Sequence, residues 1–309
     1  MEERELKKYE GKRVVLMACS KCNIVCKHCY ISYTGNRTPE ELEDLAKHYM
    51  QQDKIVRIDG AEPLVDLGYL KTYKTVGQYW IMTNGFRIYN EPEVIDYIKE
   101  NGITHIYMSY HFGIQNNING ITNDMLNLNI KRIRENGLNA VLMTTITNQN
   151  AKDTLKICDT AYELGAAAIE FNKLFIQGRA KDLINAKLHR EDYDEFFKQF
   201  AIAKEKYNGK LELTRSGTFG CDTYDKTNIF RCNAGVKKVY ITPDDKVYAC
   251  SCICKTGYEI GKVIDGEIYL YADFQNDRTF CLGDKLGEFG IEDIRELNNP
   301  KIRSLIRKN

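Results

Sequence analysis

The sequence predicts an α/β fold in which parallel strands alternate with helices. Short apolar runs of strand length recur through the first half of the chain, and a helical stretch separates each run from the next. Strands joined through helices pair in parallel with right-handed crossovers, so we expect a curved sheet covered by helices. Six such units, rather than eight, predict an open, partial (β/α)6 TIM-like barrel.

The individual elements follow in order. The strands are expected around Val14, Ile55, Trp80, Thr104, Ala140 and Ala167. The helices between them are expected over 39–52, 66–76, 91–100, 122–136 and 151–164, and a further amphipathic helix over 190–207 would close the barrel. Thr38 before Pro39, and Thr122 or Asn123, are the expected capping residues at helix starts. Glycines able to adopt the left-handed cap follow three helices, at Gly102, Gly137 and Gly165.

Length and composition set the broad class. A chain of 309 residues is longer than one ordinary domain, so we expect a core domain over 1–209 and a smaller C-terminal domain over 210–309. No signal peptide and no apolar stretch of about 18 residues occurs, which predicts a cytoplasmic protein that does not enter the membrane. The net charge of +1 gives no general attraction to nucleic acid. Eleven cysteines in such a chain indicate metal rather than disulfides.

Three cysteines follow the first predicted strand in the segment CNIVCKHC. Cys22, Cys26 and Cys29 lie on the loop that leaves the apolar run Val14 to Met17. Thiolates are soft donors that suit iron–sulfur clusters or zinc. A cubane cluster commonly takes four cysteines, so three protein ligands would leave one iron open to bind another molecule. An open metal position is typical of a site that does chemistry.

Zinc is the alternative for this loop. Cys19 could complete a four-thiolate site together with the three loop cysteines. Zinc ribbons usually carry a second CxxC or HxxxH nearby, whereas the next cysteine after Cys29 is Cys158. Zinc is therefore the weaker interpretation.

The spacing resembles the CxxxCxxC signature of the radical SAM superfamily. The resemblance implies a [4Fe-4S] cluster held by three cysteines and by S-adenosylmethionine (SAM), and reductive cleavage of SAM to a 5′-deoxyadenosyl radical that abstracts a hydrogen atom from a substrate. It also implies a reductase such as flavodoxin or ferredoxin as a partner. His28 stands where the family prefers an aromatic residue whose backbone meets the adenine. Tyr30 could shield the cluster from solvent.

Three further fragments resemble the SAM pocket of this family, each at the end of a predicted strand. The segment Gly60 to Pro63 (GAEP) is similar to the family's GGEP, TNG at 83–85 to its TNG turn, and SYHFG at 109–113 to its SLDG-like stretch. Each fragment alone has a composition that is common in turns, but no purely structural requirement explains why they occur in this order at successive strand ends. The SAM-binding positions that the resemblance implies are His28, Tyr30, Gly60, Ala61, Glu62, Pro63, Thr83, Asn84, Ser109, Thr144 and Arg179, the last of these in a strand-end GRA segment.

Cysteines become dense again in the C-terminal third of the chain. RCNAG at 231–235 and ITPDDKVYAC at 241–250 resemble the start of SPASM and twitch auxiliary-cluster domains, and read as a β-hairpin in which Asp245 replaces the family's turn glycine. The resemblance implies one auxiliary [4Fe-4S] cluster. Its expected ligands are Cys232, Cys250 and Cys281, with the fourth from Cys221, Cys252 or Cys254. Cys252 and Cys254 would share a face with Cys250 if the strand continued.

Cys221 has a second interpretation. A thiol that binds no metal can donate a hydrogen atom to a substrate radical, as in radical peptide epimerases, and Cys221 is the candidate catalytic residue of this kind. If it is such a donor, Cys221→Ala should leave iron content and SAM cleavage intact. If it is a ligand, the variant should lose iron.

The family resemblance implies a substrate class only broadly. Members with SPASM or twitch domains most often modify ribosomally made peptides by crosslinking, thioether formation or epimerisation, and this is the expected function. A small-molecule dehydrogenase is the alternative. A non-catalytic electron carrier is disfavoured, because it would need no SAM pocket. The first strand begins near residue 13, so we expect a leader peptide to bind the barrel or a separate protein.

Overall fold

The computed structural model describes residues 4–112, 121–216, 219, 233–274 and 281–308. The strands are β1 (Leu6–Lys8), β2 (Arg13–Met17), β3 (Ile55–Asp59), β4 (Trp80–Thr83), β5 (His105–Ser109), β6 (Asn139–Ile146), β7 (Ala168–Lys173), β8 (Glu212–Arg215), β9 (Lys238–Ile241), β10 (Lys246–Tyr248), β11 (Gly261–Ile264) and β12 (Glu267–Tyr271). The α-helices are α1 (Pro39–Gln51), α2 (Tyr69–Thr75), α3 (Phe86–Asn90), α4 (Val94–Glu100), α5 (Asn123–Glu135), α6 (Thr154–Glu163), α7 (Arg190–Lys206), α8 (Leu282–Glu288) and α9 (Pro300–Lys308).

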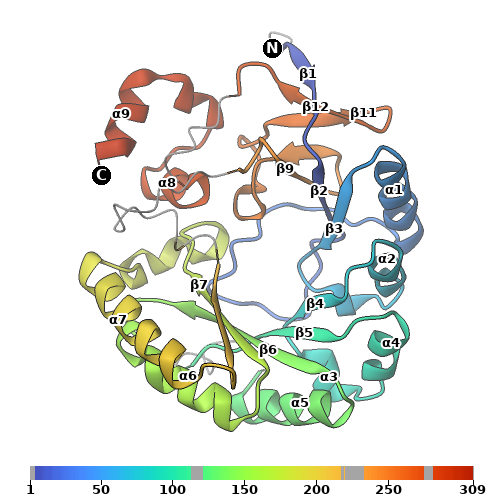
Figure 1. Ribbon diagram of the computed structural model, residues 1–309. Coiled ribbons are helices and arrows are strands. Elements are labelled where there is room, and N and C mark those ends of the chain that lie inside the picture. Colours follow the sequence, from blue (N-terminus) through green and yellow to red (C-terminus); the bar gives the residue numbers. More distant parts are fainter. Residues whose placement is uncertain (1–3, 113–120, 217–218, 220–232, 275–280, 309) are drawn as a thin grey trace.

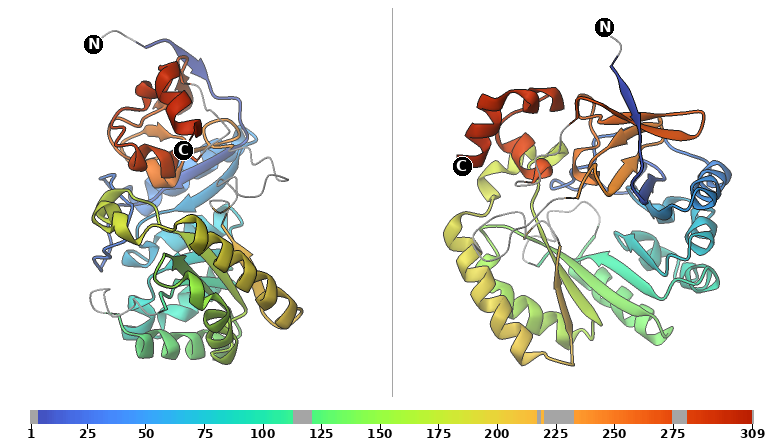
Figure 2. Two further views of the ribbon diagram at one scale, coloured as in Figure 1. Left: turned by 90° about the vertical axis from the view of Figure 1, so that its left-hand side faces the viewer. Right: turned by 45° about the horizontal axis from the view of Figure 1, so that its top comes forward.

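These strands form two sheets that curve into a partial barrel. One sheet has five parallel strands in the order β4-β5-β6-β7-β8, and the other has seven in the order β1-β12-β11-β10-β9-β2-β3. Helices α1 to α7 lie along the outer side of the curved wall, and α8 and α9 lie beside its open end (Figures 1 and 2). The predicted α/β class with a partial barrel is confirmed, and all six predicted strands and their intervening helices are present.

A buried glutamine joins the two sheets where β3 meets β4. The side chain of Gln78 accepts a hydrogen bond from the Ile58 backbone N–H at 2.9 Å and donates one to the Ile58 carbonyl at 3.0 Å. Its amide also donates to the Trp80 carbonyl at 3.2 Å. This side chain therefore takes the place of a neighbouring strand's backbone, and it keeps the polar groups of Ile58 satisfied inside the protein.

Six of the strands and α-helices were not predicted: β1, the short helix α3, β8, which pairs in parallel with β7, the strands β11 and β12, and the helix α8. The predicted hairpin is present as β9 and β10, and Asp245 has φ +60° in its turn. Strand β9 also pairs in parallel with β2. The division at 209/210 stays a prediction, while these pairings show that both segments contribute to both sheets. No helix of the described ranges is long and apolar enough to cross a membrane.

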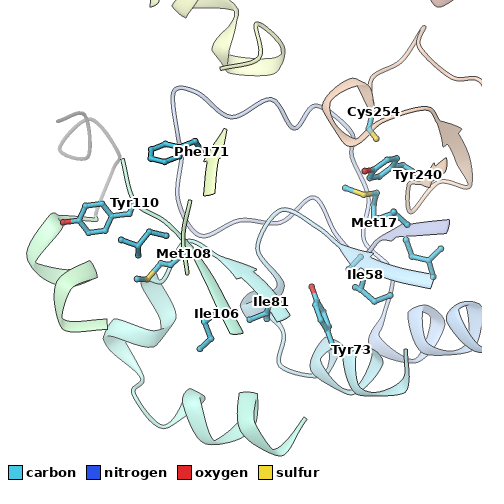
Figure 3. Packing of buried hydrophobic residues seen from close by; sticks show 14 of the residues in the cluster. Met17, Ile58, Tyr73, Ile81, Ile106, Met108, Tyr110, Phe171, Tyr240 and Cys254 are labelled. Atoms are coloured by element: carbon cyan, nitrogen blue, oxygen red, sulfur yellow. The ribbon is translucent and has the colours of Figure 1, made fainter. Parts of the chain in front are cut away.

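Alternate side chains of the strands face opposite sides of the wall. Ile58, Ile81 and Ile106 are fully buried beneath the helices, as Figure 3 shows for these residues and for Tyr73 of α2. Asp59 and Ser109 alternate with this set and are only partly buried. Because successive strand residues point to opposite faces, they line the inner side of the barrel. The carboxyl ends of β2 to β7 thus open onto a partly polar interior.

Candidate active site

The loop that follows β2 brings three thiols together. Cys22 is exposed, and Cys26 and Cys29 are half-buried. Burial, the neighbouring thiols of Cys29 and Cys22, and other lesser effects raise the pKa of Cys26 to about 12. Burial likewise raises the pKa of Cys22, to which the Asn84 side-chain amide donates at 3.6 Å. Three soft donors on one loop, close enough to repel one another as thiolates, fit a cluster that would disperse their charge.

Cys19 does not join this group. It is fully buried, and its Sγ lies 3.8 Å from the Lys21 carbonyl and 3.9 Å from the Glu62 carbonyl. Across the described parts of the chain, no three His, Cys, Asp or Glu side chains are arranged to surround a single metal ion. Zinc needs its thiolates around one centre, whereas the cysteines of a cubane bind different irons. Cys19, held in the core by backbone carbonyls, is thus not placed as a fourth thiolate for this loop.

The segment Gly60 to Pro63 forms a tight turn against the start of the cysteine loop. The backbone N–H groups of Ala61 and Glu62 donate to the carbonyls of Cys19 at 3.1 Å and Lys21 at 3.2 Å. These donors are therefore engaged within the protein. A methionine ammonium is itself a donor, so a cofactor held here would use carbonyl oxygens of the turn.

The carboxylate of Glu62 holds this turn to the end of β4. It accepts hydrogen bonds from the Thr83 hydroxyl at 2.8 Å, the Asn84 N–H at 2.7 Å and the Leu64 N–H at 3.0 Å. Glu62 is fully buried, and that burial raises its pKa to about 7 although all three donors oppose the shift. Glu62 thus positions the turn and the TNG segment relative to each other.

The raised pKa of Glu62 predicts a specific pH dependence of stability. A carboxyl whose folded-state pKa lies above the unfolded value of 4.5 stabilises fully below that value, and the contribution disappears as the pH rises through about 7. In metal-free protein, the unfolding free energy of the wild type relative to Glu62→Gln should therefore fall by on the order of 3 kcal/mol across this window. Urea unfolding of both proteins from acid to neutral pH measures it. A difference that rises with pH would mean that the three hydrogen bonds outweigh burial.

The TNG turn positions the cysteine loop from the other side. Asn84 donates through Nδ2 to Asn23 Oδ1 at 2.7 Å and accepts through Oδ1 from the Phe86 N–H at 2.8 Å, at the start of α3. Gly85 has φ +81°, and a Cβ there would lie 2.7 Å from Met108 Sδ. Only glycine fits this backbone, so the predicted turn has a steric cause.

Two histidines meet at the ends of the cysteine loop and β5. The rings of His28 and His111 are edge to face, with centroids 4.2 Å apart. Burial lowers the pKa of His28 to about 4 and also lowers the pKa of His111. The Thr145 N–H donates to His111 Nδ1 at 3.3 Å, so the ring proton of neutral His111 is on Nε2. His111 was not among the predicted site residues, although its place two residues after Ser109 at a strand end could have indicated it.

Thr144 and Ser109 differ in how their positions suit a cofactor. The Thr144 hydroxyl is buried and donates to the Tyr110 carbonyl at 2.7 Å, so it holds the end of β5. Ser109 is the last residue of β5 and lies on the partly buried inner face. The position of Ser109 therefore fits its predicted role in SAM binding, whereas the hydroxyl of Thr144 is already engaged within the protein.

The GRA segment after β7 binds the cysteine loop directly. Arg179 donates through Nε to the Cys26 carbonyl at 2.8 Å and through its backbone N–H to the Cys29 carbonyl at 3.0 Å. Gly178 has φ +57°, and a Cβ there would lie 2.7 Å from the Cys29 carbonyl oxygen. Arg179 thus holds the loop that carries the thiols.

A second group of thiols lies between the end of β10 and the start of α8, near the cysteine loop. Cys252 and Cys281 are buried together with Phe175, and Cys250 and Tyr30 pack against this cluster. Interaction with the neighbouring thiol of Cys252 lowers the pKa of Cys250. Tyr30 directly follows the first cysteine motif, and its ring meets that of Phe175 edge to face at 6.1 Å. Tyr30 therefore connects the first cysteine loop to the second group of thiols.

The other predicted ligands of the auxiliary cluster are Cys254, Cys221 and Cys232. The strand ends at Tyr248, and 251–253 forms a 3-10 turn, so Cys254 does not share a strand face with Cys250 as it would in a continued strand. Cys254 packs instead in the main core beside Tyr240 (Figure 3). Cys221 and Cys232 lie outside the described residues.

Comparison with known proteins places this site in context. Residues 18–161 match the family model described as the Radical SAM superfamily. The chain is 20% identical over 259 residues to the antilisterial bacteriocin subtilosin biosynthesis protein AlbA of Bacillus subtilis, covering 79% of this chain and 55% of AlbA. It is 25% identical over 242 residues to the AdoMet-dependent heme synthase of Oleidesulfovibrio alaskensis, covering 72% of this chain and 59% of that protein.

Solved structures share the fold. Streptococcus suis SuiB bound to precursor peptide SuiA superposes with a TM-score of 0.65 at 15% identity, over 87% of this chain and 66% of that chain. At that identity the likeness concerns the fold alone. The chain spans less than two thirds of the length of both curated relatives.

Proposed function

We propose that this chain, whose residues 18–161 match the Radical SAM family model, is a radical SAM enzyme that modifies a ribosomally synthesised peptide with the help of an auxiliary iron–sulfur cluster. The family implies a [4Fe-4S] cluster and SAM. The observation that supports the proposal is the second thiol group, against which Tyr30 of the first cysteine loop packs. Two proteins that resemble this chain are linked to peptides. AlbA is a biosynthesis protein of the bacteriocin subtilosin, and SuiB has a solved structure with its precursor peptide SuiA bound.

The first site is built for a cofactor that is held from several strand ends. Cys22, Cys26 and Cys29 would hold the cluster, and the Gly60 to Pro63 turn and Ser109 would hold SAM. When bound, the pair supplies one-electron chemistry able to remove a hydrogen atom from an unactivated carbon. Glu62 and Arg179 position the loops that carry these groups.

The auxiliary site would use Cys250, Cys252 and Cys281, with Cys232 as the fourth ligand. Cys252 and Cys281 belong to one cluster of buried side chains and Cys250 packs against it, while Cys254 belongs to the main core, which Cys250 also contacts. The auxiliary cluster would accept the electron left on an oxidised substrate or bind the substrate directly. A reductase such as flavodoxin or ferredoxin would supply the first site.

A small-molecule substrate is the second candidate. The chain is 25% identical to an AdoMet-dependent heme synthase and 20% identical to AlbA, and the higher identity to the heme synthase favours a small-molecule substrate. The partly polar inner face, with Asp59, Ser109 and Glu170, suits either substrate.

Peptides encoded beside the gene provide the test. Each short neighbouring reading frame is synthesised and incubated with reconstituted protein, SAM and dithionite, and the product is analysed by tandem mass spectrometry. A crosslink removes two hydrogens, and an epimerisation in deuterated water places one deuterium on the product carbon if a thiol such as Cys221 quenches the radical. Unchanged peptides, together with oxidation of a small alcohol or porphyrin precursor, would contradict the peptide proposal.

A further inference from the structure

Helix α8 lies unusually close to the segment that follows β7. Cys281 directly precedes the helix and is buried. Gly283 and Gly287 are four residues apart and therefore share one helix face. A Cβ on Gly287 would lie 2.2 Å from the Ile176 carbonyl oxygen, and one on Gly283 would lie 3.2 Å from Cβ of Cys252. The helix backbone is thus in direct contact with the chain after β7 and with the second thiol group.

An ion pair joins α8 to the end of β7. Lys173 Nζ lies 2.9 Å from Asp284 Oδ2, and the side chains are only 1% and 3% exposed. A second pair joins α8 to the segment before α7, Lys187 to Glu288 at 2.8 Å, but these side chains are 19% and 29% exposed. The two pairs therefore hold the same helix in different environments.

The buried pair is poorly suited to a purely stabilising role. Removing two charges from water is costly, and apolar residues of similar size often stabilise as well or better. In addition, Asp284 Oδ1 has no hydrogen-bond partner among the described residues. A short, directional contact adds a defined geometry, because it fixes the rotation of α8 about its own axis. The glycine contacts alone would allow the helix to rotate or slide.

We propose that Lys173 and Asp284 are positioning residues that hold α8 in the one orientation placing the Cys281 thiol beside Cys250 and Cys252. Asp284 lies one helical turn after Cys281, so its contact with Lys173 acts on the start of the helix. The chain continues from Lys173 through Phe175 to Arg179, which binds the first cysteine loop. The segment after β7 therefore aligns both thiol groups. That these thiols bind a cluster rests on the proposed function; their placement does not.

Thiol labelling of the metal-free protein tests the placement. The alkylation rate of Cys281 is followed by peptide mass spectrometry in the wild type, Lys173→Met and Lys187→Met, with Cys158, buried in α6, as internal reference. Lys173→Met should raise the rate at Cys281 roughly tenfold or more through local opening, while Lys187→Met changes it less than about twofold. Cys158 should stay protected in all three, which separates local opening from global unfolding.

A double variant separates position from charge burial. Lys173→Met with Asp284→Leu leaves no unpaired buried charge, so it should fold even if Lys173→Met does not. On the proposal Cys281 is still labelled faster than in the wild type, because the directional contact is lost. Wild-type protection of Cys281 in the folded double variant would overturn the proposal.

Iron content distinguishes this proposal from the proposed function. Wild type holding about eight irons and the double variant about four would support both. Wild type holding only about four irons would refute the auxiliary cluster, while the labelling result would still decide the role of the pair. Eight irons in both proteins, with unchanged cluster spectra, would refute the positioning role alone.

Discussion

Replacing Cys22, Cys26 and Cys29 together with alanine is expected to abolish the cleavage of SAM to 5′-deoxyadenosine under dithionite. The three thiols are the soft donors of the loop that follows β2, and Arg179 and Asn84 hold that loop in place without supplying a thiolate. With no cluster there is no electron donor next to SAM. Product formation, measured by chromatography after anaerobic reconstitution, should fall to the level without protein.

Cys158→Ala is the matched control. It also removes a thiol, but from a fully buried position within α6, so cleavage should stay within about twofold of wild type. If the folded, reconstituted triple variant still cleaves SAM, the loop does not hold the cluster that cleaves it.

The second large effect concerns the auxiliary site. The reconstituted wild type should hold about eight irons, as two cubanes, and Cys250→Ala with Cys281→Ala should reduce this to about four. Cys281 belongs to the buried group around Phe175, and Cys250 packs against that group. Iron and sulfide analysis, together with the absorbance of the cluster, measures the change.

Cys254→Ala provides the control for this experiment. Cys254 donates to the Cys250 carbonyl at 3.4 Å and packs in the main core, so its loss should leave about eight irons bound. Zinc as the dominant metal, or an iron content that is unchanged when Cys250 and Cys281 are lost, would contradict the two-cluster account.

Local signals in the sequence predicted much of the barrel. Thr38 forms a capping box with Glu41, and Gly85 occupies a left-handed position at which a side chain would collide with Met108. Such features depend on neighbours in the chain or on backbone conformation, which the residue types report directly. The same holds for the hairpin turn at Asp245.

Features that depend on distant contacts were not predictable in this way. In the sequence Gln78 is an ordinary polar residue. Only the structure shows that its side chain makes the hydrogen bonds to Ile58 that a neighbouring strand's backbone would otherwise make. Strand β8 is four residues long and gains its partner from β7. A short segment of this kind carries little periodicity.

The cysteines of the C-terminal region illustrate the same limit. Their spacing alone predicts that Cys250, Cys252 and Cys254 share one face if the strand continues, but the chain turns after Tyr248 and Cys254 packs in the core. The docking of α8, which brings Cys281 to Cys252, depends on residues more than a hundred positions away, as the Lys173–Asp284 pair shows.

The electron paramagnetic resonance spectrum of the reduced protein tests the central claim most directly. If Cys22, Cys26 and Cys29 hold a cluster with one open iron, adding SAM should shift the spectrum of that cluster through coordination at the open position. The shift should persist in Cys250→Ala with Cys281→Ala, which leaves the first site intact, and should be absent from the triple variant. A reduced cluster whose spectrum does not respond to SAM, or a shift that survives loss of the three loop cysteines, would contradict the account.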